Sequence, residues 1–139
     1  MVGVSDTRRR IPIVGMEGVG ERFPLRTLGD GLTRIFHIAL AMGNAKGGVA
    51  IIDEFENGLY WEVQRLLWPL IFKMAEALDI QLFVTTHSND CLRGFIAAWQ
   101  CLPDFGTLHR LERDKSEATA IELPLVNSAD AIATDVEVR

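Results

Sequence analysis

The chain has 139 residues, of which 48% are hydrophobic and 24% charged, and its formal net charge is −5. These values fit one soluble globular domain, and the acidic balance gives no support for direct nucleic-acid binding. No apolar run reaches the ~20 residues of a membrane span, and the N-terminus lacks the apolar core of a signal peptide. The cysteines, Cys91 and Cys101, match no metal or redox spacing, which favours a reducing, cytoplasmic location.

The first forty residues predict a flexible lead-in, a hairpin and a helix. Residues 1–10 are the lead-in, and residues 11–14 and 22–25 are short strands around a glycine-rich turn. Asp30 can cap a helix that ends near residues 43–44. The apolar positions that predict this helix are Leu32, Ile35, Phe36, Ala39 and Leu40, and His37 falls outside them.

The most informative stretch is the apolar run Val49–Ile52, which leads directly into the carboxylates of Asp53 and Glu54. A short apolar run between glycine and charge is typical of a strand that is buried on both faces, and such strands belong to α/β sheets. Open parallel sheets bind their ligands at the carboxyl ends of the strands. Two adjacent acids there repel each other unless a cation or a substrate proton is close. The alternative is a strand that simply ends in solvent.

A β-α-β unit follows the tight turn at Asn57 and Gly58. A long amphipathic helix, interrupted at Pro69 by a kink or a fresh start, has its apolar stripe at Val63, Leu66, Leu67, Leu70, Ile71, Met74 and Leu78. Residues 80–85 form the second strand, and Ser88 caps a helix that runs to about residue 99.

The two strands of this unit should be parallel, with a right-handed connection. If they are neighbours, His87 lies at the same edge of the sheet as Asp53 and Glu54. A lone histidine there is as readily structural as functional, but the two acids favour function. Further along, residues 107–113 and 117–123 predict an edge hairpin, and residues 127–134 predict a last short helix.

Three stretches in this order resemble the signature, Walker B and switch-histidine segments of ABC-type ATPases. They are Leu28-Gly29-Asp30-Gly31, then Val49-Ala50-Ile51-Ile52-Asp53-Glu54, then Phe83-Val84-Thr85-Thr86-His87-Ser88. Asp53-Glu54-Phe55-Glu56-Asn57-Gly58-Leu59 is similar to a stretch of the AAA-family proteins of the overcoming-lysogenization-defect, RecF and structural-maintenance-of-chromosomes kind. The resemblance covers roughly residues 11–139 and implies an α/β, P-loop NTPase-like lobe.

The resemblance implies roles for these residues in binding and hydrolysing ATP. Asp53 would hold Mg²⁺, Glu54 would act as general base on the attacking water, and His87 would contact the γ-phosphate. Gly29, Asp30 and Gly31 would offer backbone N–H groups to ATP held by a second subunit in an ATP-dependent homodimer. Asn57 and Gly58 would link the two sites.

The chain departs from the family pattern in two respects. Leu28 stands where the signature usually has Ser, and Asp30 where it has Gly. The sequence also contains no Gly-x-x-x-x-Gly-Lys-Ser/Thr, the P-loop that cradles the phosphates. We therefore expect the C-terminal lobe of an ATPase, with the P-loop half supplied by the same or another chain. A nuclease or DNA-associated partner is compatible with the family. The alternative is a protein-interaction module that keeps this fold without hydrolysing ATP.

Overall fold

The computed structural model describes residues 12–15, 17–18, 20–114 and 117–125. The predicted lead-in at 1–10 and the predicted last helix at 127–134 lie outside these residues. Within the described part, none of the helices combines the length and the apolar character that a membrane crossing requires.

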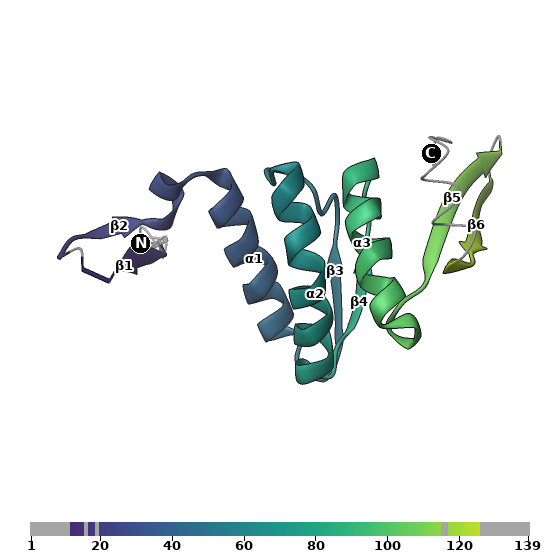
Figure 1. Ribbon diagram of the computed structural model, residues 1–139, viewed down its shortest axis with the longest axis horizontal. Helices are drawn as coiled ribbons and strands as arrows, with labels where there is room; N and C mark the ends of the chain where they lie inside the picture. The colour runs from purple at the N-terminus through teal and green to yellow at the C-terminus, as the bar shows by residue number, and fades with distance from the viewer. Residues whose placement is uncertain (1–11, 16, 19, 115–116, 126–139) are drawn as a thin grey trace, which may run out of the picture.

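Three helices stand side by side, with an antiparallel hairpin at each end of the row (Figure 1). The helices are α1 (Asp30–Asn44), α2 (Trp61–Leu78) and α3 (Asn89–Cys101). The hairpins are β1 (Ile13–Gly15) with β2 (Arg22–Pro24), and β5 (Leu108–Asp114) with β6 (Glu117–Leu123). Short 3-10 helices at Leu25–Leu28 and Pro103–Phe105 join them to α1 and α3. Both predicted hairpins are present. In the part of the chain that the structure describes, β5 and β6 form a sheet of their own and do not extend the edge of another sheet as predicted.

The centre of the molecule is a parallel pair of strands, β3 (Val49–Ile52) and β4 (Gln81–Val84), with α2 as the crossover. Ile51 lies opposite Phe83 and Ile52 opposite Val84 in the register. The predicted β-α-β unit is therefore present. Because both strands run in the same direction, the segments that follow Ile52 and Val84 meet at one edge.

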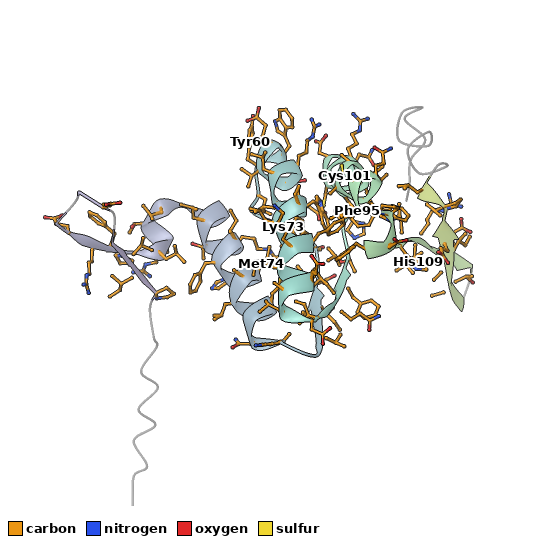
Figure 2. All side chains as sticks on the ribbon, turned by 60° about the horizontal axis from the view of Figure 1, so that its bottom comes forward. Tyr60, Lys73, Met74, Phe95, Cys101 and His109 are labelled. Atoms are coloured by element: carbon orange, nitrogen blue, oxygen red, sulfur yellow. The ribbon has the colours of Figure 1, made fainter. Side chains whose placement is uncertain are left out.

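The core lies between the helices and one face of this sheet. Met42, Phe55 and Cys91 are completely buried. Phe55 stacks on Trp68 with 4.7 Å between the ring centroids, and the edge of Trp68 meets Phe95 at 5.1 Å. Figure 2 labels Phe95 on α3. The segment just after β3 is thus anchored by an aromatic side chain.

The other face of the sheet is exposed, which corrects the prediction of strands buried on both faces. Ala50 and Ile52 point into the core, whereas Val49 is 56% exposed, Ile51 73% and Phe83 52%. Within the described residues, β3 and β4 pair only with each other. The physical reason for the difference is that all of the covering helices described here lie on one side.

The helices also differ in detail from their predicted apolar stripes. Asp30 is the first residue of α1 and makes no capping hydrogen bond, because Gly29 occupies the N-cap position. The buried residues of α1 are Ile38 and Met42, while Leu32, Phe36 and Leu40 are exposed. In α2, Leu66 and Leu70 are exposed, and Gln64, Leu67, Trp68, Ile71 and Phe72 are buried. The helix runs through Pro69 without a fresh start.

Candidate active site

The two adjacent carboxylates lie where β3 ends and the chain turns. Glu54 has a positive φ of 46°, a left-handed conformation that costs free energy for a residue with a Cβ. Arg34 reaches across from α1, and its Nη2 donates hydrogen bonds to the carbonyl oxygens of Asp53 at 2.7 Å and Glu54 at 2.8 Å. These bonds help to hold the strained turn in place.

Thr85 connects this turn to the end of β4. Its hydroxyl donates to the Asp53 carboxylate and accepts a hydrogen bond from the Glu54 N–H at 2.9 Å. Its carbonyl accepts from the Phe55 N–H at 3.0 Å, and its N–H donates to the Ile52 carbonyl at 3.0 Å. One threonine therefore continues the parallel pairing and also orients the first acid.

A different residue contacts the second acid. The Asn57 Nδ2 donates to Glu54 Oε2, and the Asn57 N–H donates to the Glu54 carbonyl at 3.0 Å. Separate donors, Thr85 and Asn57, thus hold the two carboxylates. Both carboxylates belong to exposed residues, so that water and ions can reach them.

The turn at Gly58 packs against the beginning of α1. Gly58 has φ +76°, and a Cβ there would lie 3.8 Å from the Asp30 carbonyl oxygen. A Cβ on Gly31 would lie 3.3 Å from the Gly58 carbonyl oxygen. Gly29 and Asp30 are exposed at this helix end, whose first N–H groups have no partner within the helix. The structure therefore brings Gly29, Asp30 and Gly31 beside Asn57 and Gly58.

His87 lies at the same edge of the sheet, three residues after β4 ends. Its N–H donates to Glu56 Oε1 at 2.7 Å, and the residue is exposed. Ser88 caps the N-terminus of α3 as predicted, with its Oγ accepting from the Cys91 N–H at 3.2 Å. The predicted juxtaposition of Asp53, Glu54 and His87 is thus a property of the structure, and their roles stay predictions.

Three residues at this edge were not singled out from the sequence: Arg34, Glu56 and Thr85. Glu56 and Thr85 both belong to the motifs on which the resemblance rests. That membership is the sequence signal that could have identified them as residues of the site. Arg34 follows the signature stretch on the next turn of the helix. Nothing in its spacing indicates that the side chain reaches the carbonyls of the other motif.

The edge can be tested for its fit to magnesium. Among the described residues, no three His, Cys, Asp or Glu side chains gather into a metal cluster. Mg²⁺ at phosphate-binding sites is usually held through one or two carboxylates together with water and the phosphates, so a full protein cage is not required. The exposed Asp53 carboxylate, oriented by the Thr85 hydroxyl, fits that mode of binding.

Comparison with a solved structure bears on the fold class. A solved structure from work on ATP-driven dimerisation and DNA-stimulated activation of SMC ATPases matches with a TM-score of 0.58 and 10% identity. The match covers 82% of this chain and 65% of that chain. At this identity the likeness concerns the fold alone, and it confirms the predicted P-loop NTPase-like fold class.

Sequence comparison identifies the family. The family model described as "AAA domain, putative AbiEii toxin, Type IV TA system" matches residues 16–92, and the chain belongs to this AAA domain family. An "ATP/GTP phosphatase" of Helicobacter pylori (strain ATCC 700392 / 26695) is 33% identical over 78 residues. That match covers 54% of this chain and 21% of that protein, so the shared region is about a fifth of the relative's length. The resemblance to an AAA/ABC-type ATPase is thereby confirmed.

Proposed function

We propose that the chain is the signature and Walker B lobe of a magnesium-dependent ATP hydrolase that pairs with a second copy when ATP is bound. The observation that supports this most directly is the turn at Asp53 and Glu54. Two exposed carboxylates follow a parallel strand that is buried on one face, and donors from two different segments hold them separately. An edge of this kind is where α/β sheets bind ligands.

Asp53 is the residue that would hold Mg²⁺, which neutralises phosphate charge when bound. The Thr85 hydroxyl donates to this carboxylate and so limits its rotation. The same hydroxyl accepts the Glu54 N–H, which links the metal-binding residue to the backbone of the neighbouring acid. A change at Thr85 therefore affects both positions.

Glu54 is the general base in this proposal. A base must lie within hydrogen-bond reach of the water that it activates, and it must be held there. The Asn57 side chain holds the carboxylate, while Arg34 and Thr85 hold the backbone. His87 then contacts the γ-phosphate from the neighbouring loop, across the same edge.

The start of α1 is proposed to meet the ATP of the second copy. Exposed N–H groups at a helix N-terminus, together with the helix dipole, favour an anion such as phosphate. Gly31 and Gly58 approach closely. The turn that follows Asp53 and Glu54 therefore contacts the N-terminus of α1, which would bind the ATP of the second copy. This contact supports the proposed role of Asn57 and Gly58 as the link between the two sites.

In this proposal, a second half of the ATPase carries the P-loop. This half belongs to the same polypeptide or to another one. The exposed sheet face formed by Val49, Ile51 and Phe83 supports this. Apolar side chains on a parallel sheet are normally covered on both faces. We refer to the assembled protein as the complete ATPase. A nuclease or DNA-associated partner and a cytoplasmic location stay predictions.

The test is a Glu54→Gln variant of the complete ATPase, assayed for phosphate release and for ATP binding. Removing a general base lowers kcat by roughly 10²–10⁴-fold, and ATP binding and ATP-dependent dimerisation should persist. Glu76→Gln is a matched control, because Glu76 is exposed on α2, away from this edge. Normal turnover in Glu54→Gln refutes the proposed base. ATP binding without turnover in the unaltered protein would favour a non-hydrolysing interaction module.

A further inference from the structure

The side chain of Glu56 joins the two loops of the candidate site. Its Oε2 accepts a hydrogen bond from the Thr86 hydroxyl at 2.6 Å, and its Oε1 accepts the His87 N–H at 2.7 Å. The Thr86 hydroxyl in turn accepts the Ser88 N–H at 3.1 Å. A single carboxylate is therefore bonded to two consecutive residues of the loop and connected to a third.

Glu56 is itself fixed to the core. The residue before it, Phe55, is completely buried and stacks on Trp68. The Phe55 N–H is bonded to the Thr85 carbonyl at 3.0 Å. The carboxylate thus extends from a rigid point, and a rigid support is what a positioning group needs in order to hold a second group in place.

The surroundings keep this carboxylate charged at neutral pH. Burial raises the pKa of the Glu56 carboxyl, but the hydrogen bonds from Thr86 and His87 bring the pKa below its ordinary value. Cys91 lies beneath it, and burial raises the pKa of that thiol to about 11, so it stays neutral. Hydrogen bonds to a charged acceptor are stronger than those to a neutral one.

We infer that Glu56 is the positioning residue for His87: its carboxylate fixes the backbone of the loop from which the His87 ring reaches the γ-phosphate. This inference rests on the proposed function. The inference goes beyond the proposed function by giving Glu56 a role that involves no contact with nucleotide, metal or water. Glu56 acts only through His87, and this restriction makes the inference testable.

The first test uses the 139-residue chain without nucleotide. In Glu56→Ala, both acceptor oxygens are removed, so the His87 N–H and the Thr86 hydroxyl each lose their partner. Hydrogen exchange of the His87 amide should then be at least several-fold faster than in the unaltered chain, with exchange in α2 unchanged. Thr86→Val removes only the other donor and should leave the His87 amide closer to normal. An unchanged His87 amide in Glu56→Ala overturns the inference.

The second test is a double-mutant cycle in the complete ATPase, with Glu56→Ala, His87→Ala and the double variant. Misplacing a catalytic group by about 1 Å can cost 10²-fold in rate, so we expect Glu56→Ala to lower kcat by roughly ten- to a hundredfold. In the His87→Ala background the same change should have an effect of less than about twofold, because coupled residues are non-additive. Thermal melts establish that each variant is folded.

The outcomes separate this inference from the proposed function. Only the positioning role fails if Glu56→Ala has no effect on kcat. It also fails alone if His87→Ala lowers kcat and Glu56→Ala lowers it by the same factor in both backgrounds. If neither His87→Ala nor Glu54→Gln lowers turnover, the proposed function fails, and the positioning role fails with it.

Discussion

At the scale of single residues, the candidate site depends on side chains that hold the backbone of other residues. Arg34 bonds to two carbonyls of the Asp53–Glu54 turn, Thr85 bonds to both of its residues, and Glu56 bonds to the His87 N–H. The strained φ of Glu54 is stable only because such contacts surround it. Most of the geometry of the two loops is therefore set by residues outside the predicted catalytic set.

The lowered pKa of Glu56 gives a prediction on acid stability. A carboxyl whose folded-state pKa lies below its ordinary value of 4.5 stabilises the fold above that value. The contribution is lost as the pH falls through the lower, folded-state pKa. The difference in unfolding free energy between the unaltered chain and Glu56→Gln should therefore shrink as the pH falls below 4.5.

Chemical denaturation at several pH values measures this difference. Glu76→Gln, on the exposed face of α2, is the control and should show a much smaller dependence on pH. A difference for Glu56→Gln that stays constant over the whole range would contradict the assigned hydrogen bonds to Thr86 and His87.

At the scale of elements, the contact between α2 and α3 positions the crossover helix against the loop of His87. Gly94 is buried on α3, where a Cβ would lie 2.9 Å from the Arg65 Cα and 3.0 Å from the Trp68 Cδ1. The Trp68 Nε1 donates to the Cys91 carbonyl at 3.0 Å, one turn earlier on α3. The helices approach so closely because no side chain separates them at Gly94.

We expect Gly94→Ala to destabilise the fold by about 1–3 kcal/mol, because the added methyl forces the backbone of α2 away. Gly43→Ala is the matched control, since Gly43 lies in α1 with open space around it. Alanine is favoured over glycine in a helix by about 1 kcal/mol, so that change should be neutral or stabilising. Thermal unfolding of both variants measures the effect, and a Gly94→Ala variant as stable as Gly43→Ala would contradict the packing.

The order and pairing of the elements could be predicted from the sequence, but their buried faces could be predicted only in part. The run Val49–Ile52 and its partner at 80–85 predicted a parallel pair, because a helix of crossover length lies between them. The stripe on α1 was correct only in part, because its apolar arc is wider than the surface that covers it. Ile35 packs against the core, whereas Leu32 and Leu40 are exposed. The buried residues Ile38 and Met42 were not in the predicted stripe. Periodicity reports which residues are apolar, not which neighbour covers them.

The candidate site, too, could be predicted from the sequence only in part. The carboxyl ends of parallel strands must meet at one edge, so Asp53 and His87 could be placed together from topology alone. The bonds of Arg34 and Glu56 depend on side-chain reach across elements that are 20 and 31 residues apart in sequence. No local pattern contains that information, although Glu56 stood inside the motif.

At the scale of the whole molecule, the exposed sheet face is the surface on which the proposed P-loop half would pack. Ile51 is 73% exposed on this face, so Ile51→Lys should leave the chain folded and prevent assembly of the complete ATPase. A lysine on a covered parallel sheet would bury an unpaired charge, which is strongly unfavourable.

Leu111→Lys provides the control, because Leu111 is 67% exposed on the distant β5 strand. Circular dichroism measures the fold, and light scattering of each variant mixed with the P-loop half measures assembly. Assembly of Ile51→Lys as efficient as that of Leu111→Lys would show that the sheet face is not the contact.

The most direct test of the account is a titration of the 139-residue chain with Mg-ATP, alone and with the P-loop half, followed by light scattering for mass. We expect no saturable binding by the chain alone. With the P-loop half present, we expect saturable binding and a shift to the mass of a dimer of the complete ATPase. Saturable binding by the chain alone, with a shift to its own dimer, would contradict the account, because the lobe would then contain a nucleotide site of its own.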